Sequence, residues 1–179
     1  MLNCGLSADF EKYQKTLVNE IFEKFGLEMT KKEKLHSHFT LKYLFETKNI
    51  EEVEKTLETF VSNHKKTPVG VGGFDSFYPK VIFVKVMPSN EARANFVELI
   101  KELRKIPWLA WNQCDGEDMR FHSTIAEECN EKFDGVWEFI QSKEPKHFDC
   151  FFDNITILKQ ASNTKLLGKW KVHNIFKMK

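Results

Sequence analysis

The 179-residue sequence has no long uncharged apolar run, and its formal net charge of +1 at pH 7 favours neither sign. The segment from Met1 to Phe25 lacks the basic start and apolar centre of a secretory signal, and no stretch is typical of a membrane span. We therefore expect a cytoplasmic protein without a membrane partner. The balanced charge also excludes the strongly basic class of nucleic-acid-binding domains, so a polyanion would have to be held by local charges.

Cysteine is scarce and irregularly spaced. The four cysteines, Cys4, Cys114, Cys129 and Cys150, form no Cys-x-x-Cys pair. This pattern predicts reduced thiols in a reducing compartment rather than a disulfide framework. Low-complexity segments are also absent from the sequence, whereas phenylalanine is abundant, with 17 residues that lie mostly at periodic positions. We interpret most of them as core residues of a compact unit.

Apolar periodicity alternates between helix and strand, and the order of the elements repeats along the chain. We expect an α+β fold with two pseudo-symmetric lobes, each a mostly antiparallel sheet with helices on its outer face, and a groove between them. Residues 1–179 would form one bilobal domain, with lobe-forming repeats of about 1–78 and 79–179. The predicted helices span 7–25, 49–61, 89–103 and 130–140, and the predicted strands span 2–4, 69–77, 81–86, 148–158 and 170–176 in addition to two strands described next.

Two copies of a His-x-Thr-apolar pattern carry the chemistry. They are His38-Phe39-Thr40-Leu41 and His122-Ser123-Thr124-Ile125, and the histidines are 122 − 38 = 84 positions apart, close to the repeat of the elements. In a strand, His and Thr two positions apart point to the same face. Two such strands facing each other would supply an acid, a base and two hydroxyl donors, which is sufficient for chemistry on a phosphodiester.

The same two-residue period adds cationic residues to the predicted groove. It aligns His36 and Lys42 with the first motif and Arg120 with the second. These three residues are candidate substrate-binding groups. Because these strand faces carry cationic hydrogen-bond donors and no carboxylate, they favour an anionic ligand, and phosphate fits best.

The paired motifs resemble those of the 2H phosphoesterase superfamily, and the chain is most similar to its 2′-5′ RNA ligase branch. The strand Val69-Gly70-Val71-Gly72-Gly73-Phe74 and the segment Ile155-Thr156-Ile157-Leu158 extend the resemblance, whereas Ser123 stands where an apolar residue is usual. The resemblance implies a phosphoesterase that needs no metal or other cofactor. It would act on a 2′,3′-cyclic phosphate or a 2′,5′-phosphodiester, of an RNA end or a small nucleotide, and would also run in reverse as a 2′-5′ RNA ligase.

In this interpretation His38 and His122 are the acid and base, in either order, and Thr40 and Thr124 bind the nonbridging phosphate oxygens. A noncatalytic RNA-end-binding module is an alternative that keeps the groove without turnover. A metal site is a second alternative, in which His36 and His38 would be joined by one of His122, Asp115 or Glu117. An exposed Trp108 or Trp111 could also stack on a nucleobase, although core packing is the better interpretation for at least one of them.

Overall fold

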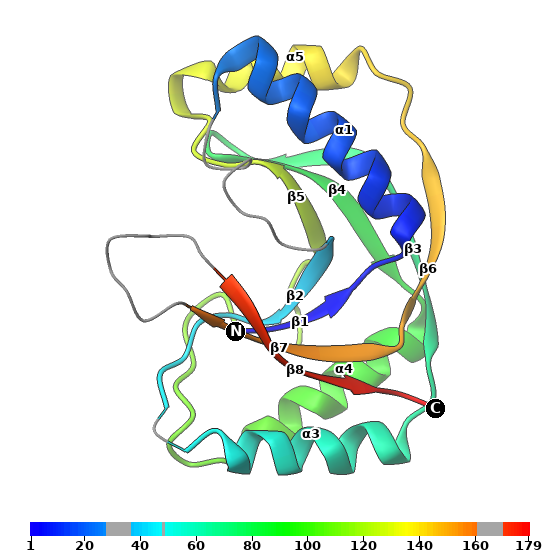
Figure 1. The fold of residues 1–179 in the computed structure, drawn as a ribbon, viewed down its shortest axis with the longest axis vertical. Coiled ribbons are helices and arrows are strands. Elements are labelled where there is room, and N and C mark those ends of the chain that lie inside the picture. Colours follow the sequence, from blue (N-terminus) through cyan, green and yellow to red (C-terminus); the bar gives the residue numbers. More distant parts are fainter. Residues whose placement is uncertain (28–36, 48, 161–169) are drawn as a thin grey trace.

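The computed structural model describes residues 1–27, 37–47, 49–160 and 170–179. Helices and strands alternate along most of the chain, as the sequence predicts (Figure 1). In chain order the elements are β1 (Leu2–Gly5), α1 (Ala8–Phe25), β2 (His38–Lys42), α3 (Glu51–Asn63), β3 (Thr67–Phe77), β4 (Val81–Pro88), α4 (Asn90–Leu103), β5 (His122–Ala126), a 3₁₀ turn η1 (Asn130–Lys132), α5 (Phe133–Gln141), β6 (His147–Phe152), β7 (Asn154–Gln160) and β8 (Trp170–Lys177).

The strands formed by the described residues make two four-stranded sheets. The first sheet has the order β2-β1-β7-β8 and the second the order β5-β4-β3-β6. All neighbouring strands in both sheets are antiparallel. The predicted α+β class with two antiparallel sheets is therefore confirmed.

The sheets do not coincide with the two halves of the chain. β1 and β2 share the first sheet with β7 and β8, whereas β3 joins β4, β5 and β6 in the second. The prediction that the lobes correspond to 1–78 and 79–179 thus needs correction. The hairpin between β3 and β4 crosses that boundary, and β7 returns to pair with β1, so each sheet takes strands from both halves.

Local capping signals fix where two of the helices begin. Ser7 Oγ accepts a hydrogen bond from the backbone N–H of Phe10 at 3.3 Å, and Ser89 Oγ accepts one from Ala92 at 3.1 Å. These bonds satisfy amide groups that have no partner in the first turn of a helix. α1 ends at Phe25, and the C-cap residue Gly26 has a φ of 66°, in the left-handed region that favours glycine.

The helices lie in two pairs, one beside each sheet. Figure 1 shows α1 and α5 beside the second sheet, and the rings of Phe25 and Phe139 join these two helices at 5.7 Å. Figure 1 shows α3 and α4 beside the first sheet, where α3 contacts α4 and β8. α4 also contacts β3 and β4 of the second sheet. Each of these helices buries an apolar stripe against the core.

The predicted strand 148–158 is two strands. β6 ends at Phe152 and β7 begins at Asn154, so the chain leaves the second sheet and enters the first at Asp153. The alternating apolar residues are Phe148, Cys150 and Phe152 before this point and Ile155 and Ile157 after it, so the phase of the alternation shifts at the polar pair Asp153-Asn154. This segment is the connection between the two sheets on the right side of Figure 1.

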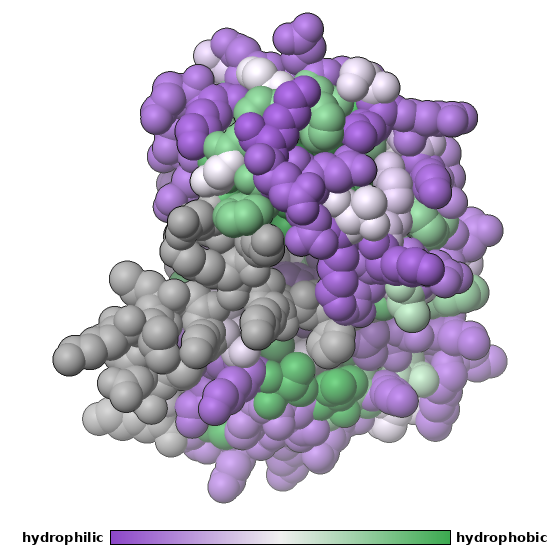
Figure 2. Space-filling view, turned by 45° about the horizontal axis from the view of Figure 1, so that its top comes forward, coloured by the Kyte–Doolittle hydropathy of each residue, from purple (hydrophilic) through white to green (hydrophobic). Residues whose placement is uncertain are grey.

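The surface is largely polar. Figure 2 shows charged and polar side chains over most of one face, with apolar side chains in small groups. None of the helices formed by the described residues is both long and apolar enough to span a bilayer.

Candidate active site

The two predicted motif strands are edge strands of different sheets. β2 carries His38 and Thr40 at the edge of the first sheet, and β5 carries His122 and Thr124 at the edge of the second. The two strands have the same burial pattern, in which the histidine and threonine are partly exposed and the residue between them is buried. The shared pattern follows from strand alternation and places the two motifs in equivalent local environments.

Both motif strands also carry the same irregularity directly after the threonine. In the register of β1 with β2, Leu2 lies opposite Lys42 and Asn3 opposite Thr40, so β2 has one extra residue. The pairing of β4 with β5 has the same shift, because Ile82 lies opposite Ala126 and Phe83 opposite Thr124. Such bulges bend a strand and redirect the side chains beside them.

An aromatic contact joins the two strands behind the motif side chains. β2 contacts β5, and the ring centroids of Phe39 and Phe121 are 4.7 Å apart. Phe121 also packs edge-to-face against Phe96 of α4, at 4.7 Å. Phe39 follows His38 and Phe121 precedes His122, so this buried contact brings the two motifs together although they are far apart in the sequence.

His122 is held by its own strand and by two aromatic rings. Its Nδ1 lies 2.9 Å from the carbonyl oxygen of Arg120. Because a carbonyl can only accept, Nδ1 must carry the proton, and the neutral ring then has its lone pair on Nε2. Phe77 packs edge-to-face on the imidazole at 5.0 Å, and Phe83 lies at 4.9 Å.

These surroundings change the protonation of His122. Burial lowers the pKa of its imidazole, and the positive charge of Arg120 lowers it further, while the hydrogen bond to the Arg120 carbonyl acts in the opposite direction. The net effect is a pKa below the ordinary value of about 6.5. His122 is therefore predominantly neutral at pH 7, with Nε2 able to accept a proton.

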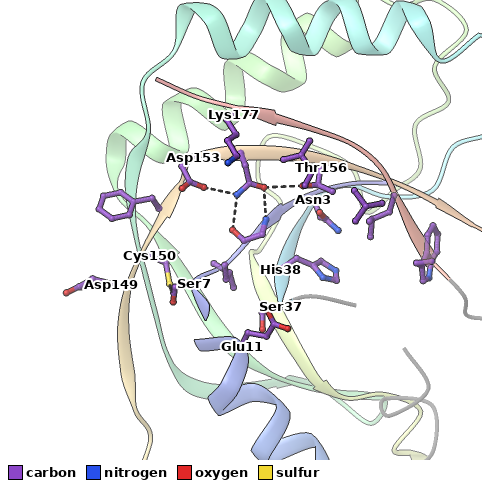
Figure 3. Close-up of a pocket in the computed structure, with 18 residues that line it drawn as sticks. Asn3, Ser7, Glu11, Ser37, His38, Asp149, Cys150, Asp153, Thr156 and Lys177 are labelled. Atoms are coloured by element: carbon purple, nitrogen blue, oxygen red, sulfur yellow. Dashed lines mark hydrogen bonds between the residues drawn. The ribbon is translucent and has the colours of Figure 1, made fainter. Parts of the chain in front are cut away.

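His38 lines a cavity of about 690 Å³ that lies beside the first sheet (Figure 3). The cavity extends across β1, β7 and β8 and reaches Ser7 and Glu11 at the start of α1. Apolar side chains that include Trp170 form part of its wall. This volume lies within the range of about 300 to 1,000 Å³ that is usual for small-ligand sites.

A polar network supports the strand opposite His38. Gly5 lies directly opposite His38 in the register of β1 with β2. The side-chain amide of Asn154 pairs with Gly5 as a second strand would, accepting from its N–H at 2.9 Å and donating to its carbonyl at 3.1 Å. Thr156 Oγ1 donates to the same Asn154 oxygen at 3.2 Å. Asn154 therefore fixes the backbone of β1 beside His38.

Lys42 does not reach the groove. Its side chain is fully buried, and its Nζ lies 2.8 Å from an Asp115 carboxylate oxygen and 2.8 Å from the carbonyl oxygen of Ala110. The extra residue in β2 places both Leu41 and Lys42 in the interior, so the prediction from strict alternation after Thr40 was wrong about the face. We therefore do not retain Lys42 as a substrate contact.

Arg120 is accessible, but its side chain has partners in this structure. It forms an ion pair with Asp75 of β3, and its guanidinium lies over the rings of Phe77 and Phe83 at 5.7 and 5.3 Å. Because 51% of the Arg120 side chain is exposed, it stays a candidate contact for an anion. His36 lies outside the described residues.

The residues of the metal alternative do not come together in the part of the chain that the structure describes. Within it, no three His, Cys, Asp or Glu side chains lie close enough to share an ion. Asp115 is bound instead to Lys42 and to the backbone N–H of Tyr43, at 2.8 Å. Both Trp108 and Trp111 are partly buried against the core, which fits the packing interpretation.

Three amide side chains near the motifs, Gln14, Asn3 and Asn154, were not predicted from the sequence. Asn3 and Asn154 line the cavity, and Gln14 bonds to residues beside or within both motifs. Single amide side chains follow no periodic rule, and their partners come from other elements. Apolar periodicity and motif spacing therefore give no indication of these three residues.

Two antiparallel sheets that each present a His-x-Thr edge strand define the class of the 2H phosphoesterases. The comparison with family models agrees, because the model of the 2′-5′ RNA ligase superfamily matches residues 12–164. The chain belongs to this superfamily. The resemblance seen in the sequence is thus confirmed at the level of the family, whereas no curated protein sequence matches the chain.

Solved structures share the fold over nearly the whole chain. A phosphoesterase crystal structure has a TM-score of 0.58 at 11% identity, covering 99% of this chain and 95% of that one. E. coli LigT complexed with 3′-AMP has a TM-score of 0.53 at 12% identity, with 99% and 95% covered. Usb1 of Kluyveromyces marxianus has a TM-score of 0.50 at 14% identity, with 96% and 94% covered. At such identities the similarity establishes the fold alone.

Proposed function

We propose that this protein is a metal-independent phosphoesterase that opens 2′,3′-cyclic phosphates or cleaves 2′,5′-phosphodiesters by two-histidine acid/base catalysis. The observation that carries the proposal is the equivalent placement of His38-Thr40 and His122-Thr124 on two strands that contact each other. The same set of groups would also join RNA ends in the reverse direction, with a ribose hydroxyl in place of water.

The protonation state of His122 suggests how the two roles divide. Its lowered pKa and its Nδ1–H bond to the Arg120 carbonyl make the neutral ring a proton acceptor at Nε2. In hydrolysis His122 would take a proton from the attacking water, and His38 would give one to the departing ribose oxygen. Both histidines return to their starting states once protons exchange with solvent.

The threonines would act on the phosphate itself. Each Thr lies two residues after its histidine on the same face, so its hydroxyl is placed beside the imidazole. Thr40 and Thr124 would donate to the nonbridging oxygens, where negative charge increases in the transition state. Arg120 would stabilise the same charge if it exchanges Asp75 for the substrate.

We infer an RNA end or a small nucleotide as the substrate. The cavity beside His38 is large enough for a nucleotide and combines polar groups with an apolar wall. The family name refers to RNA, and the structural neighbour LigT was solved with 3′-AMP. These likenesses support the substrate class.

The decisive experiment incubates the protein with a short RNA that ends in a 2′,3′-cyclic phosphate, in the presence of EDTA. We expect opening to a single phosphate isomer, reduced by about 10² to 10⁴ in both His38→Ala and His122→Ala. His173→Ala is the matched control, because this histidine pairs with Glu54 of α3 at 3.3 Å and has no role in the proposal.

Each alternative result has a defined meaning. Near-normal turnover in either motif variant would refute two-histidine catalysis. Loss of activity in EDTA that returns with a divalent metal would support the metal alternative. RNA that binds with normal affinity but is not opened would support the noncatalytic RNA-end-binding module.

The acid and base roles can be separated with an activated substrate. A nucleotide p-nitrophenyl phosphodiester releases a stabilised anion that needs no proton from an acid. If His38 is the acid, His38→Ala regains most of its turnover on this substrate, whereas His122→Ala does not. The opposite result would exchange the two roles.

A further inference from the structure

The side chain of Gln14 connects the two motif strands. Ser37, the residue before His38, donates its hydroxyl hydrogen to Gln14 Oε1 at 2.5 Å. Gln14 Nε2 donates in turn to Ser123 Oγ at 3.0 Å and to the carbonyl oxygen of Thr124 at 2.7 Å. Gln14 lies on α1, which contacts β5 (Figure 1). One amide thus links the two motifs, which lie in different sheets.

The chemistry of the partners fixes the orientation of this amide. The Thr124 carbonyl can only accept, so the nitrogen of Gln14 must face it, and the oxygen must face Ser37. Both amide hydrogens and the amide oxygen then have partners. A carboxylate or an apolar side chain at position 14 could not make the same three bonds.

The serine partners are buried, so the bonds cannot be replaced by water at low cost. Ser37 is 3% exposed and Ser123 is 1% exposed. Ser123 occupies the inward-facing position between His122 and Thr124, where the family usually has an apolar residue. In this chain the buried serine hydroxyl at that position has a hydrogen-bond partner, because it accepts from Gln14.

We propose that Gln14 is a positioning residue that sets the distance and angle between the two His-x-Thr strands. The inference depends on the proposed function, since its main effect is on a reaction that needs both histidines at once. The aromatic contact between Phe39 and Phe121 tolerates sliding, whereas hydrogen bonds restrict distance and direction. A displacement of about 1 Å between reacting groups can cost about 10²-fold in rate.

The first test compares kcat and KM of Gln14→Leu with those of the unmodified protein, on the RNA cyclic phosphate. Leucine keeps most of the volume and removes all three bonds. We expect kcat to fall by about tenfold or more, with KM within about threefold, because the amide aligns the catalytic groups and does not bind substrate.

Ser89→Ala separates positioning from a general loss of stability. Ser89 caps α4 through its bond from Ala92, and it lies outside the site. Its loss should lower Tm by roughly 2 to 4 °C without changing kcat. A fall in kcat of Gln14→Leu no larger than that of Ser89→Ala would overturn the proposal.

A cycle of serine variants provides a readout that a purely structural role would not give. If Gln14 couples the strands, Ser37→Ala and Ser123→Ala affect kcat nonadditively in the presence of Gln14, and each has little effect in Gln14→Leu. Additive effects in both backgrounds would refute the coupling. These conservative variants also keep the test valid if Gln14→Leu fails to fold.

A structural readout keeps this test separate from that of the proposed function. If the unmodified protein opens no cyclic phosphate, the proposed function fails, and the NMR signals of the histidine rings still report on the Gln14 contacts. We expect the signals of both His38 and His122 to shift in Gln14→Leu and to stay unchanged in Ser89→Ala. A shift confined to one of the two rings, or absent from both, would overturn the positioning role.

Discussion

Replacing Asp115 with asparagine should destabilise the protein strongly, because it leaves a buried ammonium without its counterion. The side chains of Lys42 and Asp115 both have no exposed surface, and their charged atoms are 2.8 Å apart. The second carboxylate oxygen of Asp115 accepts from the Tyr43 N–H at 2.8 Å. This pair ties the loop around Ala110 to the end of the strand that carries His38.

The size of the effect follows from which contacts survive. The amide introduced by Asp115→Asn would keep an oxygen for the Tyr43 N–H. Its nitrogen would then face Lys42 and the backbone N–H of Asn112, which donates to the same carboxylate oxygen as Lys42 at 3.1 Å, so the negative charge and the Asn112 bond are both lost. Removing one partner of a buried pair costs about 3 to 5 kcal/mol. For a chain of this size, each kcal/mol lowers Tm by about 2 to 4 °C, so the expected decrease in Tm is about 6 to 20 °C.

Urea unfolding and thermal melting measure the effect, and a double variant provides the control. Lys42→Met combined with Asp115→Asn removes both charges of the pair and should recover most of the lost stability, because neither side chain is then a buried charge without its partner. Asp115→Asn with unfolding free energy within about 1 kcal/mol of the unmodified protein would refute the reasoning. The double variant should also keep KM within about threefold, and a rise of about tenfold or more would restore Lys42 as a substrate contact.

Other parts of the structure support three more predictions. The acidic limb of kcat/KM against pH should have its midpoint below about 6.5, since burial lowers the pKa of His122 and keeps it neutral; a midpoint above that value would contradict its role as base. Gly73→Ala should cost about 1 kcal/mol or more in urea unfolding because its φ is 70°, whereas Gly135→Ala inside α5 should be neutral or stabilising. Fragments 1–78 and 79–179 should each lack the native circular dichroism and should recover it only when mixed, because β1 pairs with β7 and β3 with β4 and β6; a fragment that folds alone would show that these pairings are dispensable.

Local patterns predicted the elements well because they depend on neighbours in the sequence. Ser7 and Ser89 begin helices through side-chain caps, and both His-x-Thr motifs lie on strands with the expected alternation of burial. The accessible face shared by His38 and Thr40 is a direct consequence of that alternation. These features need no information from distant residues.

The predictions from the sequence fail where contacts with residues far away in the chain override the local strand pattern. An extra residue in β2 opposite β1 moved Lys42 from the predicted groove into the interior, where Asp115 neutralises it. At the change of sheet the polar pair Asp153-Asn154 shifts the phase of the apolar alternation, but the pattern does not indicate that β6 and β7 pair with different strands. Register and pairing are set by the whole fold, and the sequence pattern constrains them weakly.

The two halves of the chain, which look like repeats of each other, exchange strands between the two sheets. This exchange explains how the two halves form one site. If each half formed its own sheet, the two motifs would meet only through a surface between separate lobes. Instead, β1 and β2 are held by β7 from the second half, while β3 from the first half lies inside the other sheet. The helix pairs cross in the same way, since α1 lies with α5 and brings Gln14 to both motif strands. The relative position of His38 and His122 is therefore a property of the complete core, and changes far from both histidines can alter it.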